Sequence, residues 1–317
     1  SLKKLDTETL KSFRDRFAIP LKDEELDDVP YYRPAPDSPE LMYMKKRRQD
    51  LGGFYPKRRK DSQPLQIPDL DIFKQVLEGS NGREISTTMS FVRILSALVK
   101  DKRVGKRVVP IVPDEARTFG MEGMFRQLGI YTSEGQKYVP QDREQIMYYR
   151  EDKKGQILQE GINEGGSMAA WMAASGDIQA RGFLIGGTAG RTTLNGEGLQ
   201  HQDGHSHILA NTIPNCKSYD PAYAYEMAVV IHHGMKEMYE DNKNVFYYLT
   251  MENENYVQPA MPKGCEEGII KGMYKFSSVE AKGKGKTKLR VQLLGSGAIM
   301  NEVNAAAELL KDDWGVS

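Results

Sequence analysis

The stretch IPNCKSYDPAYAYEMAVVIHHGMKEMYEDNKNVFYYLT, residues 213–250, decides the fold class. Its last part, Val245 to Thr250, is a run of β-branched and aromatic residues typical of a strand, and Ile213 to Tyr219 is predicted as another. The apolar run between them, from about Ala222 to Tyr239, predicts a helix that begins at Asp220-Pro221, a cap followed by proline at the first helical position. Strand, helix and strand in succession predict an α/β unit.

The same alternation of strands and helices extends in both directions along the chain. Upstream, Ser86 caps a predicted helix with an apolar stripe that ends at Val99, and Arg107 to Val112 is predicted as a buried strand. Downstream, residues 289–294 are predicted as a strand and residues 302–311 as a helix. The pattern favours an α/β fold with a doubly wound, mostly parallel sheet.

Composition excludes several classes of protein. The chain has 317 residues, with 44 Lys plus Arg balanced by 44 Asp plus Glu, which argues against bulk electrostatic binding of nucleic acid or anionic membranes. No apolar run approaches the roughly 18–20 residues that a membrane span needs, and the first residues lack the apolar core of a secretory signal. Two cysteines, Cys216 and Cys265, fit a reducing cytosol. We therefore expect a cytoplasmic protein without a nucleic-acid or membrane partner.

The first 65 residues differ from the rest. A short helix is predicted after Asp6, but residues 30–68 are polar and interrupted by prolines, with basic clusters at residues 45–48 and 57–60. Because the chain as a whole is neutral, we do not assign these basic clusters to nucleic-acid binding. We interpret residues 1–65 as an arm between domains or subunits.

Carboxylates provide the first candidate site. Asp114 and Glu115 directly follow a predicted buried strand, and two neighbouring carboxylates in a cleft can serve acid–base chemistry. Glu160 and Glu164 are weaker candidates, because carboxylates at this spacing also occur on ordinary solvated helices.

Histidines provide the second candidate site, in the run LQHQDGHSH at residues 199–207. His201, His205 and His207 with Asp203 could bind zinc, although no cysteine pair and no His-Glu-x-x-His helix supports this reading. A structural histidine and a catalytic histidine that polarises a substrate remain the other two readings.

Four runs together carry a resemblance to a known family. They are DEARTFGMEG at 114–123, QEGINE at 159–164, GDIQARGFLIGGTAGRTTLNGEGLQHQDGHSH at 176–207 and YDPAYAYE at 219–226. The sequence resembles the E1 family of bacterial pyruvate dehydrogenase complexes, homodimeric enzymes of the transketolase-like thiamine diphosphate superfamily. The resemblance covers essentially the whole chain.

The resemblance implies a domain organisation. Residues 1–65 would be the tail of an N-terminal domain and an inter-domain arm, residues 66–262 the pyrimidine-binding middle domain, and residues 263–317 a linker and the start of a C-terminal domain. The family's Gly-Asp-Gly motif is not present, so the site for the cofactor diphosphate and Mg²⁺ is expected outside this segment. Between Ala174 and Ser175 the family carries roughly 30 further residues, about one supersecondary unit.

The resemblance also implies residue roles. Glu164 would be catalytic and would bind the cofactor, by a hydrogen bond to N1′ of the aminopyrimidine of thiamine diphosphate. Asp114 and Glu115 would line the pyrimidine side of the cleft, Asp114 as a cofactor-binding residue and Glu115 as a catalytic one. His201 would contact the substrate or its adduct. No metal ligand is expected in this segment.

The implied function is thiamine diphosphate-dependent decarboxylation of pyruvate with reductive acetylation of the lipoyl group of the E2 acetyltransferase. The enzyme would be a homodimer with its site between two subunits. One alternative is an E1 for another 2-oxo acid. A second is a zinc-dependent hydrolase that uses His201, His205 and His207. A third is a non-catalytic binding fragment whose basic arm binds an acidic partner.

Overall fold

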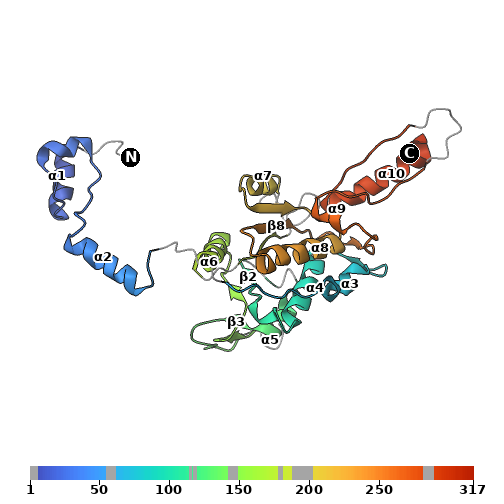
Figure 1. The fold of residues 1–317 in the computed structure, drawn as a ribbon, viewed down its shortest axis with the longest axis horizontal. Helices are drawn as coiled ribbons and strands as arrows, with labels where there is room; N and C mark the ends of the chain where they lie inside the picture. The colour runs from blue at the N-terminus through green and yellow to red at the C-terminus, as the bar shows by residue number, and fades with distance from the viewer. Residues whose placement is uncertain are drawn as a thin grey trace. The chain divides into compact units, whose positions relative to one another are not determined.

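A computed structural model describes residues 6–54, 62–113, 116, 120–141, 149–177, 181–187, 203–280 and 289–317. The chain divides into two compact units, Ser1–Lys57 and Arg58–Ser317, which are described separately (Figure 1). No helix in the described ranges has the length and apolar character that crossing a bilayer requires.

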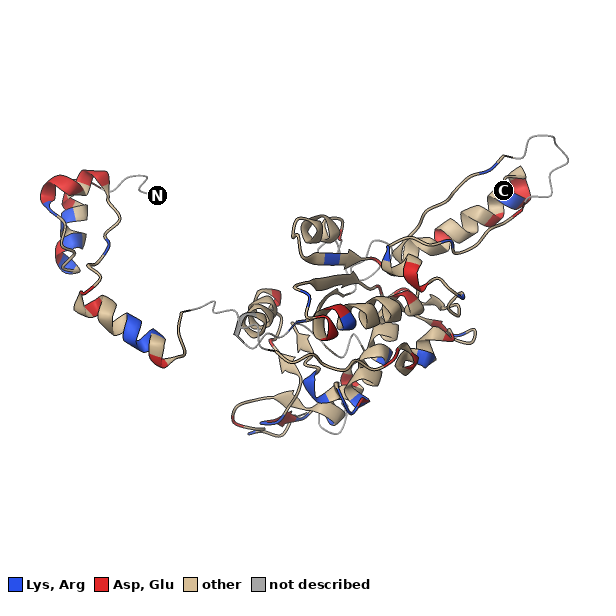
Figure 2. Ribbon diagram, viewed as in Figure 1, with Lys and Arg blue, Asp and Glu red and all other residues tan. Residues whose placement is uncertain are grey.

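The first unit consists of short helices. Helix α1 (Thr7–Arg16) begins as predicted, because the Asp6 carboxylate accepts a hydrogen bond of 2.7 Å from the backbone N–H of Thr9. A 3₁₀ turn η1 (Asp23–Asp28) follows, and helix α2 (Pro39–Asp50) starts at the cap Ser38. Helix α2 carries the basic cluster 45–48 (Figure 2). Residues 39–50 thus form a helix within the proline-rich stretch 30–68, and the second basic cluster lies outside the described residues.

The central sheet of the second unit contains three parallel strands in the order β6 (Phe183–Gly186), β8 (Phe246–Thr250) and β7 (Cys216–Tyr219). Strand β8 lies in the middle, where Tyr247 and Leu249 are fully buried. The predicted strand–helix–strand unit is thus confirmed as a parallel β7–α8–β8 crossover. Strand β7 is shorter than predicted because Pro214 has no N–H and the chain turns there, with Cys216 N–H bonded to the Ile213 carbonyl.

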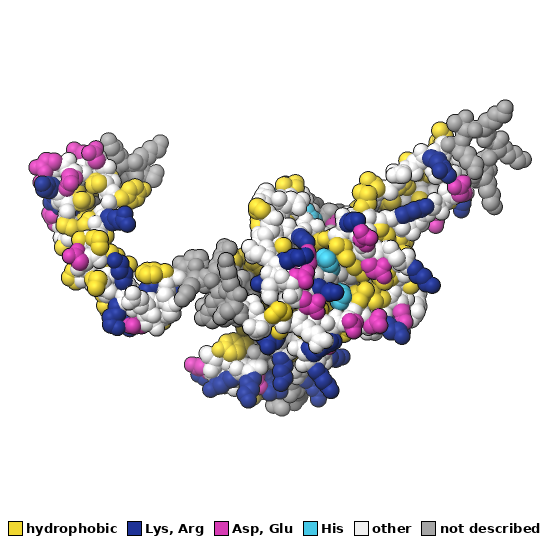
Figure 3. Space-filling view, viewed as in Figure 1, with side chains coloured by type: hydrophobic (Ala, Val, Ile, Leu, Met, Phe, Trp, Pro, Cys, Tyr) yellow, Lys and Arg dark blue, Asp and Glu magenta, His cyan; other side chains and the backbone are white. Residues whose placement is uncertain are grey.

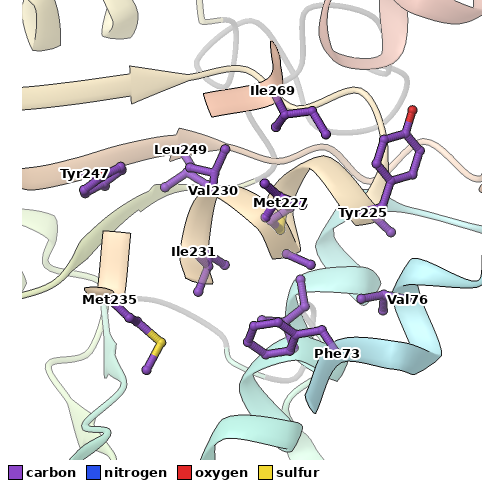
Figure 4. Packing of buried hydrophobic residues seen from close by; sticks show 14 of the residues in the cluster. Phe73, Val76, Tyr225, Met227, Val230, Ile231, Met235, Tyr247, Leu249 and Ile269 are labelled. Carbon is purple, nitrogen blue, oxygen red and sulfur yellow. The ribbon is translucent and has the colours of Figure 1, made fainter. Parts of the chain in front are cut away.

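Helix α8 (Ala224–Met235) packs on this sheet and continues as a π-helical turn, η5 (Lys236–Glu240). Figure 4 shows Val230 and Ile231 of α8 in the cluster that includes Leu249 of the sheet. Helix α4 (Thr87–Lys100), the 3₁₀ turn η2 (Leu70–Phe73) and helix α3 (Lys74–Leu77) contact α8 as well, so this one helix is central to the main core.

The predicted start of helix α8 is wrong. Asp220 does not cap it; Tyr223 is the N-cap residue, and the Glu226 carboxylate reaches back to accept hydrogen bonds from the N–H groups of Ala222 (2.6 Å) and Tyr223 (3.2 Å). Glu226 also accepts a 2.5 Å bond from the Tyr274 hydroxyl, and burial raises its pKa. Because Glu226 satisfies these donors, Asp220 is available for other contacts.

Smaller parallel pairs complete the second unit. Strand β2 (Ile111–Val112) pairs with β5 (Leu158–Gln159), and β3 (Ile130–Tyr131) pairs with β4 (Glu151–Asp152). Helix α5 (Glu122–Leu128) contributes Met124 and Phe125 to their core, which helix α4 also lines.

The strand predicted at 107–112 is reduced to β2, because Gly105–Arg107 form a 3₁₀ turn, η3, and Pro110 cannot donate to a ladder. The one antiparallel pair among the described strands is β1 (Glu84–Ile85) with β9 (Tyr256–Val257). Helices alternating with mostly parallel strands confirm the predicted α/β class.

The C-terminal part follows helix α9 (Glu266–Ile270). Residues 289–294 do not form the predicted strand, although Val291 N–H bonds to the Ser317 carbonyl and Ser317 N–H to the Leu289 carbonyl. A 3₁₀ turn η6 (Gly297–Ile299) leads into the last helix, α10 (Met300–Trp314), which is longer than predicted. Helix α10 contacts the N-cap residue of α8, because Asn304 donates a 3.0 Å bond to the Tyr223 hydroxyl.

A buried carboxylate lies in turn η5. Glu237 accepts hydrogen bonds from Lys217 (2.5 Å), Lys243 (3.0 Å) and the Tyr247 hydroxyl. In Figure 3 acidic, basic and histidine side chains gather over this end of α8. Burial alone would raise the pKa of Glu237, but these hydrogen bonds outweigh burial and lower it to about 2.

Candidate active site

Glu164 stands at the carboxyl edge of the β2–β5 pair. A short loop connects β5 to helix α6 (Glu164–Asp177). Asn163 caps the helix, since its side-chain oxygen accepts a 2.8 Å bond from Gly166 N–H. Glu164 is therefore the first helical residue, and Gly161, with φ +70°, adopts the left-handed conformation of the preceding loop.

The Glu164 side chain is exposed. The described residues give its carboxylate no hydrogen bond and no ion pair, so its oxygens are available to a ligand. Ile162 beside it is 81% exposed, and one turn into the helix the buried Ser167 hydroxyl has no partner among the described residues. The Glu164 carboxylate can accept a hydrogen bond, and it lies next to an apolar side chain and an unpaired hydroxyl. Such a group fits a flat ring that has apolar faces and hydrogen-bonding edges.

Three of the predicted site residues, Asp114, Glu115 and His201, lie outside the described residues. The backbone before the first two is described. The carbonyl of Pro113 accepts a 2.9 Å hydrogen bond from the N–H of Asn163, and the Val112 carbonyl accepts one of 3.0 Å from Glu160 N–H. The structure thus brings the end of β2, which leads into Asp114, next to the residue that caps the helix of Glu164.

The histidine run enters the described residues at Asp203. This carboxylate accepts bonds from the N–H groups of His205 (3.1 Å) and Ser206 (3.0 Å), which fixes the start of helix α7 (Ser206–Asn211). His205 is exposed, whereas His207 is half-buried with its Nε2 3.0 Å from the Thr250 hydroxyl. Across the described ranges, no group of three or more His, Cys, Asp or Glu side chains could hold a metal ion.

A second group of polar side chains lies at the carboxyl edge of the central sheet. Asp220 directly follows β7, Thr250 ends β8, and the Thr250 hydroxyl donates a 2.5 Å bond to Asp220. Glu252 is buried two residues further on, and its backbone carbonyl accepts bonds from the hydroxyls of Thr87 and Thr88.

Sequence reasoning missed this group because Asp220 was assigned to a helix cap. The available signal was positional: polar residues that follow parallel strands meet at one edge of the sheet.

The described part of the chain therefore contains an exposed carboxylate suited to bind an organic ligand, Glu164, and a hydrogen-bonded group around Asp220. The β2–β5 edge can form a hydrogen bond with a ring nitrogen through Glu164, the first residue of a capped helix. Trp171 of α6 packs on Phe246 of the central sheet, with ring centroids 5.2 Å apart, and this contact holds the helix in place.

Comparisons with known proteins show which family the chain is similar to. The family model for the pyruvate dehydrogenase E1 component middle domain matches residues 65–176 and 173–259. A pyruvate dehydrogenase E1 component of Pseudomonas aeruginosa is 56% identical over 348 aligned positions, covering 100% of this chain and 39% of the relative. That of Escherichia coli is 51% identical over 349 positions, covering 99% and 39%.

The chain thus spans about two-fifths of the length of the curated relatives that it matches. Among solved structures, a transketolase from Pichia stipitis overlays with a TM-score of 0.49 at 14% identity, covering 99% of this chain and 44% of the transketolase. Since the family model matches more than half of the residues, the chain belongs to the pyruvate dehydrogenase E1 component middle-domain family.

Proposed function

We propose that this chain is the middle portion of a thiamine diphosphate-dependent E1 enzyme that decarboxylates pyruvate and reductively acetylates the lipoyl group of an E2 acetyltransferase. Relatives named pyruvate dehydrogenase E1 component, 51% to 56% identical over 99% or more of the chain, support the substrate and the partner. The structural observation that carries the proposal is Glu164, an exposed carboxylate without a partner among the described residues, fixed at the first position of α6.

The residues present fit the pyrimidine end of the cofactor. Thiamine diphosphate, when bound, supplies an electron sink that makes the loss of CO₂ from a 2-oxo acid possible. The carboxyl of Glu164 would form a hydrogen bond with ring atom N1′, with Ile162 against the ring. Asp114 and Glu115 would line the same side of the cleft, and His201 would contact the substrate. The diphosphate and Mg²⁺ would be held outside this segment.

The proposed domains are residues 1–65 as the tail of an N-terminal domain and an inter-domain arm, 66–262 as the pyrimidine-binding middle domain and 263–317 as a linker and the start of a C-terminal domain. The family match between residues 65 and 259 supports the middle boundaries. We also infer that the complete polypeptide contains the family's segment of roughly 30 residues between Ala174 and Ser175. Support comes from alignments of 347 to 350 positions to a chain of 317 residues, and from the two family matches, which meet at 173–176.

The proposed enzyme is a cytoplasmic homodimer. Its site would lie between two subunits, so that Glu164 of one protomer serves a cofactor whose diphosphate the other protomer holds.

The test begins with the polypeptide expressed from its complete gene. Its intact mass is compared with 35.8 kDa, the mass of the present sequence. We then expect CO₂ release from pyruvate that requires added thiamine diphosphate and Mg²⁺, with much slower release from 2-oxoglutarate. Release from 2-oxoglutarate at the pyruvate rate or faster would assign another 2-oxo acid. Hydrolase activity that depends on stoichiometric zinc and is lost in His205→Ala would replace the proposal with the zinc alternative.

A further inference from the structure

The C-terminal segment reaches the edge of the central sheet through a short turn. The Ser296 hydroxyl donates a 2.6 Å hydrogen bond to one carboxylate oxygen of Asp220, Oδ2. The next residue, Gly297, donates its N–H to the backbone carbonyl of Asp220 at 3.2 Å. Two consecutive residues of the turn thus bind a single residue that directly follows β7.

Gly297 is the residue that permits this approach. It has φ +54°, in the left-handed region, and is buried. A Cβ at this position would lie 3.0 Å from Glu252 Oε1 and 3.1 Å from both carboxylate oxygens of Asp220. Alanine would therefore be strained in backbone conformation and would also press against three carboxylate oxygens at once.

The other carboxylate oxygen of Asp220 belongs to a different contact. Oδ1 accepts the 2.5 Å hydrogen bond from the Thr250 hydroxyl, and Thr250 Oγ1 lies 3.0 Å from His207 Nε2. A hydroxyl has one proton, and an ionised carboxylate can only accept. Because Thr250 gives its proton to Asp220, His207 must be the donor in the second contact, and its Nε2 must carry a proton.

The surroundings of His207 favour one orientation of the ring. Its ring meets the ring of Tyr248 edge to face, with centroids 5.2 Å apart. Helix α7, which carries His207, is fixed at its start by Asp203. The imidazole is therefore held by a neighbouring ring on one side and by the Thr250 hydroxyl at Nε2.

We propose that Asp220 couples the docking of the C-terminal segment to the orientation and tautomer of His207. The turn at Ser296 and Gly297 holds Oδ2 and the backbone of Asp220, which places Oδ1 to receive Thr250. Thr250 in turn accepts from His207 Nε2. When the turn is displaced, Asp220 loses its contacts with Ser296 and Gly297, and the preference of His207 for the tautomer protonated at Nε2 is weakened. This coupling is independent of the proposed cofactor and substrate.

The test is nuclear magnetic resonance of the full chain labelled with ¹⁵N at histidine, recorded near pH 8, where an ordinary imidazole is neutral. The chain has five histidines, and His207→Gln identifies the signals of His207 by their loss. In the unsubstituted protein we expect a single tautomer with the proton on Nε2. Ser296→Ala removes one exposed hydrogen-bond donor, and Gly297→Ala displaces the turn.

Both variants should shift the two ¹⁵N signals of His207 toward each other, as the tautomers begin to average. Thr250→Val should do the same directly. Ser278→Ala, an exposed serine elsewhere in the C-terminal part, should leave the signals in place. Signals of a proton on Nδ1 in the unsubstituted protein would overturn the assigned tautomer, and unchanged His207 signals in Thr250→Val would overturn the role of Thr250. Signals that respond to Thr250→Val but stay unchanged in both Ser296→Ala and Gly297→Ala would overturn the coupling.

Discussion

Replacing Glu164 by glutamine is expected to lower the rate of pyruvate-dependent CO₂ release by about 10²–10⁴-fold, the range typical of a positioned group that holds or moves a proton. The amide keeps the size of the carboxyl and one accepting oxygen, but it loses the charge and cannot hold or release a proton at the start of α6. The measurement is kcat for CO₂ release at saturating pyruvate and thiamine diphosphate, in the polypeptide expressed from its complete gene.

Glu302→Gln is the matched control. Glu302 is also an exposed glutamate in the first turn of a helix, α10, so the substitution changes the same chemical group in the same local setting. Its activity should equal that of the unsubstituted protein. An equal loss of activity in both variants, or full activity in Glu164→Gln, would remove Glu164 from the proposed mechanism.

Replacing Glu237 by glutamine is expected to lower the free energy of unfolding at pH 7 by about 3 kcal/mol. The pKa of Glu237 is lowered from its ordinary value near 4.5 to about 2 by its hydrogen-bond donors, against the effect of burial. At roughly 1.4 kcal/mol per unit, this shift corresponds to the stated loss. Glutamine resembles the protonated carboxyl, and Tyr247, which is fully buried, keeps its hydroxyl beside a weaker acceptor.

The pH dependence has a definite sign. A carboxylate whose pKa is depressed by folding stabilises the protein above its unfolded pKa, and the stabilisation disappears as pH falls through the folded pKa. The protein should therefore lose this contribution progressively from about pH 5 to about pH 2, whereas Glu237→Gln has none to lose. Urea unfolding at pH 7, 5 and 3 should show the two proteins converging in stability as pH falls.

Glu267→Gln serves as the control for this measurement. Glu267 pairs with Lys271 at 2.6 Å on the surface of α9, where both side chains are more than two-thirds exposed. Solvent screens such a pair, so this variant should unfold like the unsubstituted protein. A stability difference for Glu237→Gln that stays constant from pH 7 to pH 3 would contradict the assigned ionisation.

The fold class could be predicted from local patterns because those patterns are set by residues close in sequence. The strand at β8 and the helix capped by Ser86 follow from runs of β-branched, aromatic and apolar residues. The start of α8 could not be predicted this way. Asp220-Pro221 has the form of a cap, but Glu226 satisfies the same N–H groups from inside the helix.

The two candidate sites also differ in how far local sequence patterns predict them. The role proposed for Glu164 came from family resemblance, and its structural setting follows from a local signal, since Asn163 is a helix cap followed by an acidic first residue. The group formed by His207, Asp220 and Thr250 brings together residues 43 and 30 positions apart in the sequence. Such contacts depend on which strands are neighbours in the sheet, and no local pattern specifies that order.

The most direct test of the central claim, that Glu164 lies where the cofactor's pyrimidine binds, is hydrogen–deuterium exchange with mass spectrometry. Exchange is measured in the polypeptide from its complete gene, with and without thiamine diphosphate and Mg²⁺. A ligand ring against Glu164 and Ile162 should order the loop and the first turn of α6, whose side chains are largely exposed. We predict slower exchange in peptides that cover residues 160–168. Unchanged exchange in those peptides, whether the cofactor binds elsewhere or does not bind, would contradict the account.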